Sequence, residues 1–171
     1  TVKKYLDALE DAFIFEKARR YDIKGKAYFD SPLKYYATDV GLRNARLGFR
    51  QIEETHLMEN ILFNELVIRG YSVDVGSIRF AETKDGKKVE KNHEIDFVVN
   101  MGMKKVYIQS AFSIADAEKK EQEITPLLKS GDFFKKIVVT AGNSKPHMDE
   151  NGISFIGIIP FLLNPDSIDT V

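Results

Sequence analysis

Apolar residues recur at helical spacing in two segments, within residues 2–13 and from about Glu53 to Arg69. Intervals of three and four residues between apolar positions are typical of a helix that buries one face. A third helix is expected from Ser113, a suitable N-cap, to about Leu128. The sequence therefore predicts three helices, widely separated along the chain.

Shorter apolar or alternating runs indicate strands. They lie at residues 13–15, 27–29, 34–37, 71–80, 94–99, 106–112, 136–140 and 153–159. The polar run from Glu82 to His93, which contains Asp85 and Gly86, predicts a hairpin or a loop.

Beyond residue 50 the expected order is helix, three strands, helix, strand, strand. The three strands can pair as an antiparallel meander, and the segment from residue 106 to 140 is long enough for a right-handed crossover between parallel strands. This order predicts an α/β fold with a mixed sheet flanked by helices. We place a domain boundary near residue 50, between a small appendage (1–50) and a main domain (51–171).

Composition excludes several classes of function. The chain has 171 residues, 43% hydrophobic and 30% charged, which suits a folded domain. Cysteine is absent, so disulfides, thiol catalysis and Cys-ligated metals are excluded, and we expect a cytoplasmic location. No apolar run reaches 18 residues, so no membrane interaction is expected. The chain opens at Thr1 rather than at a methionine, which suggests a piece of a longer protein.

Charge is unevenly distributed, although the formal net charge is only −1. Residues 1–50 hold 11 Lys and Arg against 7 Asp and Glu, so nucleic-acid binding would need a local basic patch there. Arg43, Arg46 and Arg50 would share one face if their segment is helical, and they form the candidate patch. The alternatives are a solvated face or pairing with nearby glutamates.

Two acidic residues interrupt an otherwise apolar strand. Glu94 and Asp96 are expected to share one strand face, because side chains alternate along a strand. The opposite face is expected to hold Ile95, Phe97 and Val99.

Glu59 lies on the apolar face of its predicted helix, where a carboxylate must be paired, protonated or bound to a cation. Gln109 lies on the strand expected beside that of Asp96. If Glu59, Asp96 and Gln109 meet, their oxygens could hold Mg²⁺ or Mn²⁺ and activate water against a phosphodiester. The alternative is that the strand acids are solvated and Glu59 pairs with a lysine.

Five motifs follow one another in a specific order along nearly the whole chain. They are Lys34-Tyr-Tyr-Ala-Thr-Asp39-Val-Gly41-Leu-Arg-Asn, His56-Leu-Met-Glu59-Asn-Ile, Arg69-Gly70-Tyr71-Ser-Val, Glu94-Ile-Asp96-Phe and Tyr107-Ile-Gln109. Together they resemble the C-terminal domain family of a large group of bacterial and archaeal AAA-type ATPases. Tyr21-Asp-Ile-Lys-Gly25-Lys resembles the winged-helix-like connector that precedes that domain.

The resemblance implies a restriction-endonuclease-like fold of the PD-(D/E)XK group for residues 51–171, with a winged-helix-like appendage in residues 1–50. Its αβββαβ core agrees with the order predicted above. The resemblance also implies an N-terminal ATPase domain of the same chain as a partner, with ATP as its ligand. This sequence contains no phosphate-binding P-loop of its own.

By position, the resemblance assigns Glu59 to the helix acid, Asp96 to the metal-binding aspartate, Gln109 to the second acid and Ala111 to the lysine. Gln109 brings no charge to a metal. Ala111 cannot stabilise developing charge, and losing one such group costs roughly 10²–10³ in rate.

Two hypotheses follow. The first is a catalytically degenerate nuclease-like module that binds nucleic acid or a protein partner. The second is a Mg²⁺- or Mn²⁺-dependent nuclease that uses Glu59, Asp96 and Gln109, with Lys119 or Lys120 in place of the missing lysine.

Overall fold

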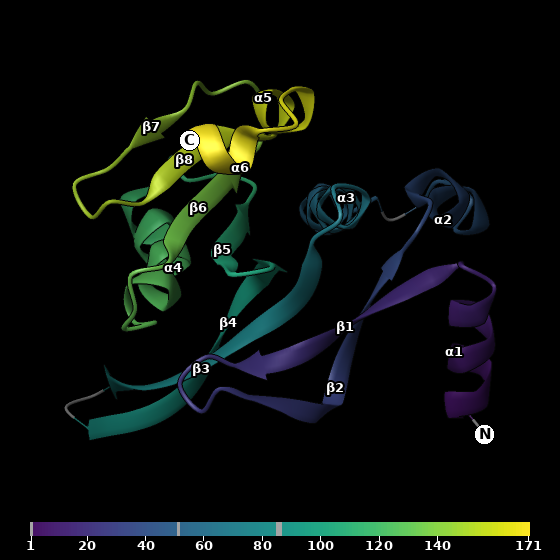
Figure 1. Ribbon diagram of the computed structural model, residues 1–171, viewed down its shortest axis with the longest axis horizontal. Coiled ribbons are helices and arrows are strands. Elements are labelled where there is room, and N and C mark those ends of the chain that lie inside the picture. Colours follow the sequence, from purple (N-terminus) through teal and green to yellow (C-terminus); the bar gives the residue numbers. More distant parts are fainter. Residues whose placement is uncertain (1, 51, 85–86) are drawn as a thin grey trace.

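A computed structural model describes residues 2–50, 52–84 and 87–171 (Figure 1). The strands are β1 (Phe15–Asp22), β2 (Ala27–Ala37), β3 (Ser72–Lys84), β4 (Lys87–Met101), β5 (Lys104–Ala111), β6 (Lys135–Thr140), β7 (His147–Met148) and β8 (Ser154–Gly157). The helices are α1 (Val2–Asp11), α2 (Val40–Arg46), α3 (Glu54–Ile68), α4 (Ala117–Leu128), α5 (Ile158–Leu163) and α6 (Ser167–Thr170).

The described strands form one eight-stranded sheet in the order β2-β1-β3-β4-β5-β6-β8-β7. β3, β4 and β5 pair antiparallel, which confirms the predicted meander. β5 and β6 pair parallel, with α4 between them in the chain, as the crossover requires. The prediction of an α/β fold with a mixed sheet is confirmed.

The sheet is covered on both faces, with α3 and α4 on opposite sides of the strands (Figure 1). α3 buries Leu62, Phe63 and Leu66 against one face. α4 buries Ile124 and Leu127 against the other. Burial of these apolar side chains is the main force that holds the helices on the sheet.

The C-terminus of α3 is fixed by a glycine. Gly70 adopts a φ of +84°, and the backbone N–H of Tyr71 donates to the carbonyl of Leu66. This is the Schellman arrangement, in which a left-handed residue closes the helix. It turns the chain directly from α3 into β3.

The predicted appendage is part of the same sheet. β1 pairs parallel with β3, with Arg20 opposite Val75, and β2 pairs antiparallel with β1. The two short strands predicted at residues 27–29 and 34–37 are one continuous strand, β2. The boundary near residue 50 stays a prediction, but the sheet crosses it.

A bulge in β4 changes the predicted strand faces. Asp74 pairs with Val98 and Gly76 pairs with Ile95, so β4 holds one extra residue over this stretch. Ile95 consequently packs with the α4 cluster, whereas Phe97 and Val99 pack with the α3 cluster. The prediction that all three share one face is wrong.

Other boundaries also differ from the sequence prediction. Asp116, not Ser113, is the N-cap of α4, because its carboxylate accepts from the Glu118 N–H at 3.0 Å. The predicted hairpin at 82–93 forms between β3 and β4, with Asp85 and Gly86 outside the described residues. None of the helices among the described residues has the length and apolar character to cross a bilayer.

Candidate functional site

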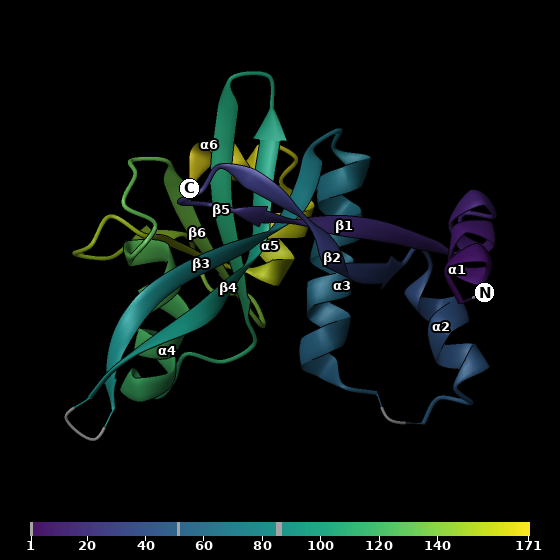
Figure 2. The ribbon, with the colours of Figure 1, turned by 90° about the horizontal axis from the view of Figure 1, so that it is seen from below.

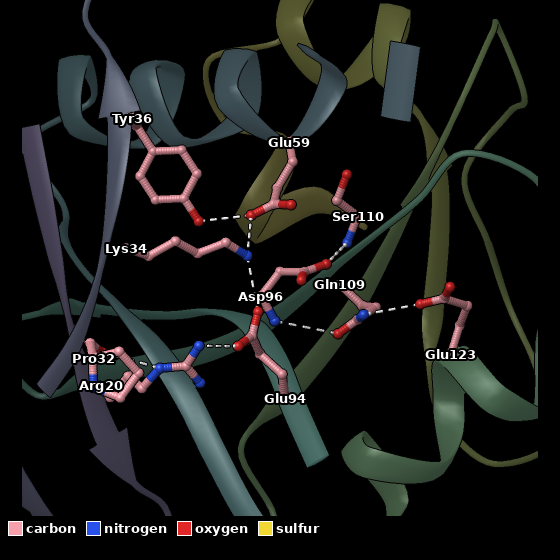
Figure 3. Close-up of polar contacts among 10 residues, drawn as sticks. All are labelled: Arg20, Pro32, Lys34, Tyr36, Glu59, Glu94, Asp96, Gln109, Ser110 and Glu123. Atoms are coloured by element: carbon pink, nitrogen blue, oxygen red, sulfur yellow. Dashed lines mark hydrogen bonds and ion pairs between the residues drawn. The ribbon is translucent and has the colours of Figure 1, made fainter. Parts of the chain in front are cut away.

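A lysine from β2 lies among the acidic residues singled out in the sequence (Figure 3). The Lys34 Nζ lies 2.6 Å from Oε1 of Glu59 on α3 and 2.8 Å from Oε1 of Glu94 on β4. Asp96, two residues beyond Glu94, lies beside them. We call Lys34, Glu59, Glu94 and Asp96 the acid cluster. Three elements far apart in sequence build it.

Two further side chains fix the carboxylates of the cluster. The Tyr36 hydroxyl donates to Glu59 Oε1 at 2.7 Å, and Arg20 Nη2 lies 2.6 Å from Glu94 Oε2. Lys34 and Tyr36 are two residues apart on β2 and both reach Glu59 because alternate residues share a strand face. Residues 1–50 thus supply Arg20, Lys34 and Tyr36, the side chains that contact the carboxylates of Glu59 and Glu94.

Asp96 is the most buried acid of the cluster, with 9% of its surface exposed. Its Oδ2 accepts from the backbone N–H of Ser110 at 2.8 Å. Burial, followed by the nearby Glu59 carboxylate, raises the pKa of Asp96 to about 8, against the opposing effects of Ser110 and Lys34. Asp96 is therefore mostly protonated at neutral pH.

The other charges of the cluster stabilise one another. Burial lowers the pKa of Lys34, but the Glu59 and Glu94 carboxylates outweigh it and raise that pKa above its ordinary value. Burial raises the pKa of Glu94, but Lys34 and Arg20 outweigh it and lower that pKa. Both side chains are therefore charged at neutral pH.

Gln109 contacts Asp96 but faces the α4 side of the sheet. Its Oε1 accepts from the Asp96 backbone N–H at 3.3 Å, and its Nε2 donates to Glu123 Oε2 on α4 at 2.9 Å. Ala111 is buried in the apolar cluster beneath α4. The sequence reasoning did not identify four residues of the site, which are Arg20, Lys34, Tyr36 and Glu123.

The remaining candidates divide between the site and other surfaces. Arg43 lines a pocket of about 200 Å³ with Lys34, His56 and Glu59. Lys120, a predicted substitute for the missing lysine, instead lies 3.9 Å from Asp149.

The predicted arginine face is only partly helical. Arg43 and Arg46 lie on α2, but Arg50 lies beyond its end, since Gly48 and Phe49 both adopt positive φ. The three arginines therefore do not share one helical face.

The cluster does not fit a Mg²⁺ or Mn²⁺ ion as it stands. Glu59 Oε1 already accepts from Tyr36 and contacts the Lys34 ammonium, and Gln109 Oε1 is used by the Asp96 N–H. In the described part of the chain, no group of three or more His, Asp or Glu residues is arranged to hold a metal. A metal bound by Glu59, Asp96 and Gln109 together stays a hypothesis, since the amide of Gln109 is not one of these residue types.

Comparison with known proteins gives two matches. Residues 1–53 match a family described as Domain of unknown function (DUF8612). An uncharacterized protein of Haemophilus influenzae is 39% identical over 163 residues, which is 95% of this chain and 37% of that protein. The chain thus spans little more than a third of that relative. No solved structure matches it.

Proposed function

We propose that this chain is a nuclease-like domain that binds nucleic acid without cleaving it. One observation carries the proposal: the Lys34 ammonium lies directly between the carboxylates of Glu59 and Glu94. The order of one helix, three strands, a second helix and further strands from α3 onward supports the restriction-endonuclease-like core that the resemblance implies.

The charge balance of the cluster supports both parts of the proposal. Glu59 and Glu94 face Lys34 and Arg20, and Asp96 is mostly protonated because its pKa is about 8. Three ionised carboxylates would repel a phosphodiester, whereas a neutral cluster does not. The same neutrality weakens the attraction for the divalent cation that cleavage would use. We therefore expect binding without hydrolysis.

The pocket beside the cluster offers donors for a phosphate. It lies between β2, α2 and α3, and Lys34, Arg43 and His56 line its basic side. Among the described residues Arg43 hydrogen-bonds to Asn44 at 2.8 Å and forms no ion pair, so most of its guanidinium donors are available. A planar guanidinium can bind two phosphate oxygens at once.

Fluorescence anisotropy with labelled oligonucleotides tests binding. Single-stranded DNA, double-stranded DNA and RNA should be compared as salt is raised from a low concentration. Arg43→Ala should weaken binding for all sequences and reduce the salt slope by about one. Arg19→Ala, which removes an exposed arginine above Tyr28, is the matched control. Failure of the wild-type protein to bind at low salt would refute the proposal.

A cleavage assay in Mn²⁺ tests the absence of hydrolysis. Cleavage that Asp96→Asn abolishes would favour the second candidate, a Mg²⁺- or Mn²⁺-dependent nuclease using Glu59, Asp96 and Gln109. The observation in its favour is that Lys34 brings an ammonium to these acids, which takes the place of the positive charge that Ala111 lacks. Such a cation could stabilise developing charge.

A protein partner is the other binding candidate, favoured by an apolar groove. The groove has a volume of about 580 Å³, and its lining includes Leu9, Ile14, Leu42 and Leu47. The two helices that contribute to it, α1 and α2, lie at one end of the molecule (Figure 2). None of the residues of α1 is buried. On the resemblance, we propose an ATPase domain of the same longer protein as this partner, in the cytoplasm.

Isothermal titration of the chain with that ATPase domain, prepared separately, tests the groove. Leu42→Asp places a charge in the groove and should abolish the heat of binding, whereas Met103→Asp, on a fully exposed turn, should not. Equal heats for both variants would exclude the groove as the contact.

A further inference from the structure

A second cavity adjoins the acid cluster through Arg20. It has a volume of about 390 Å³ and lies within the range of roughly 300–1,000 Å³ that is usual for small-ligand sites. Its lining consists of Arg20, Phe29, Pro32, Ser77, Arg79 and Asn92, and we call it the Phe29 cavity. Arg20 Nε donates to the Pro32 carbonyl at 3.2 Å, and its Nη2 lies 2.6 Å from Glu94 Oε2 (Figure 3). One ion pair therefore connects the Phe29 cavity to the acid cluster.

The strand register places the walls of the Phe29 cavity on the face of the sheet that carries the acid cluster. Phe29 lies opposite Arg20 in the pairing of β1 with β2, and Arg79 lies opposite Asn92 in the pairing of β3 with β4. Opposed residues of an antiparallel pair share a face. Asn92 is two residues from Glu94 on β4, so these two side chains also share a face. A ligand strand in the pocket beside the cluster could therefore continue over this face into the Phe29 cavity.

The Phe29 cavity offers hydrogen-bond donors that the protein does not use. Arg79 is exposed, and in the described part of the chain its guanidinium has neither a hydrogen bond nor an ion pair. Asn92 Oδ1 accepts from the Ser77 hydroxyl at 2.9 Å, which leaves the Asn92 Nδ2 as a donor. The nearby carboxylate of Glu94 is paired with Arg20. Because a guanidinium can bind two oxygens of one phosphate, these groups suit an anionic phosphate.

Phe29 adds an aromatic ring to these donors. It is 41% exposed and lies on β2, an edge strand of the sheet. The ring of its neighbour Tyr28 is covered by the Arg19 guanidinium at 4.0 Å, whereas no ring or cation of the described residues contacts that of Phe29. Nucleobases stack on such rings when they are not already stacked in a duplex. An open ring beside phosphate donors is therefore typical of a surface that binds single strands.

We propose that the Phe29 cavity is a base-stacking subsite, so that the nucleic acid bound by this chain is single-stranded. One base stacks on the Phe29 ring, and Arg79 and Asn92 bind an adjoining phosphate. The inference rests on the proposed function, because it names the kind of nucleic acid and extends the surface on which that nucleic acid lies. Single-stranded DNA and single-stranded RNA share this chemistry.

Fluorescence anisotropy with a labelled single strand, an abasic strand of the same length and charge, and the corresponding duplex tests the proposal, in DNA and RNA versions. The wild type should bind the base-containing strand at least about fivefold more tightly than the abasic strand. Phe29→Leu removes the ring but keeps an apolar side chain, and it should abolish this difference, whereas Phe29→Tyr should retain it. Phe133→Leu, at a fully exposed ring in the loop before β6, is the matched control and should behave as the wild type.

The phosphate contact has its own test. Arg79→Ala should weaken binding of the base-containing and abasic strands alike, and it should reduce the salt slope by about 0.7, the value for one phosphate of a single strand. Arg19→Ala, which removes the guanidinium over the Tyr28 ring, should leave that slope unchanged. An unchanged slope in Arg79→Ala would exclude Arg79 as the phosphate ligand.

Three results would overturn the inference while the proposed function stands, because nucleic acid still binds in each. They are equal affinity of the wild type for base-containing and abasic strands, a preference that persists in Phe29→Leu, and tighter binding of the duplex than of the single strand. If circular dichroism shows that Phe29→Leu does not fold, the base-containing and abasic strands still decide on the wild type alone. Failure of every probe to bind at low salt would instead refute the proposed function, and this inference with it.

Discussion

Asp96→Asn should stabilise the protein at alkaline pH, because it removes an ionisation that the fold opposes. Burial and the Glu59 carboxylate raise the pKa of Asp96 from 3.8 to about 8. The unfolded chain thus releases this proton near pH 4, whereas the folded protein keeps it until near pH 8. Between these values the folded state binds the additional proton, so stability falls as pH rises.

The magnitude follows from the width of that window. It spans about four pH units, and one unit corresponds to roughly 1.4 kcal/mol, so ionisation of Asp96 costs on the order of 5 kcal/mol over the whole range. Asparagine has nearly the same shape and no charge, and its side-chain oxygen can still accept from the Ser110 N–H. The substitution therefore removes the pH dependence while it preserves the hydrogen bond.

Urea unfolding of both proteins at several pH values between 4 and 9 provides the measurement. The free energy of unfolding of Asp96→Asn minus that of the wild type should increase from pH 5 to pH 8 and level off above. Asp7→Asn, on the exposed surface of α1, is the control for the loss of one acid. Parallel profiles for the wild type and Asp96→Asn would show that Asp96 is not protonated in the folded state.

Three further substitutions test the packing of the fold by urea unfolding. Leu66→Ala, at a fully buried position on α3, should cost about 2–5 kcal/mol, and a loss under 1 kcal/mol would contradict the placement of α3. In Gly157→Ala the new Cβ would lie 2.5 Å from the Ser144 nitrogen, and this clash should lower the free energy of unfolding by about 1–3 kcal/mol. Gly102→Ala is the comparison without a clash, because its Cβ meets no neighbour and only its positive φ opposes the substitution. Arg69→Met removes the hydrogen bond that Arg69 Nη2 donates to the Phe161 carbonyl at 2.8 Å, and it should lower the free energy of unfolding by about 1–3 kcal/mol. An unchanged free energy of unfolding would show that this hydrogen bond does not stabilise the fold.

Local patterns predicted most of the main-domain elements because burial leaves a periodic trace in the sequence. The strand predicted at residues 153–159 is wrong at its end, where α5 begins at Ile158, and β7, α5 and α6 were not predicted. The α3 segment and the β6 segment each combine apolar residues with a suitable length, and both formed within one residue of the predicted bounds. β1 was largely missed because its sequence, FEKARRYD, is mostly polar and only Ala18 is buried. A strand that is held mainly by backbone pairing gives little signal in its side chains.

The acids of the site were predictable, and the alternative that Glu59 pairs with a lysine is confirmed by Lys34, whereas Asp96 is buried rather than solvated. Which lysine makes the pair was not predictable. Glu59 stood out because it interrupts an apolar helix face, and Asp96 because it interrupts an apolar strand. Lys34 lies in a quoted motif, yet nothing local indicates that its side chain crosses to α3. Its contact joins positions 25 and 60 residues apart, and the bulge that directs β4 likewise depends on pairing with β3.

The contacts of Gln109 and Ala111 give both residues a structural reason of their own. On the resemblance, Gln109 and Ala111 stand at positions where a metal-dependent nuclease would use a charged group. In the folded chain, Gln109 bridges the Asp96 backbone to Glu123, and Ala111 fills the apolar cluster under α4, so both positions have structural roles. The positive charge beside the acids comes from Lys34 in residues 1–50. The sheet and the charge cluster therefore join the two parts of the chain, and any ligand of the acids must first compete with that lysine.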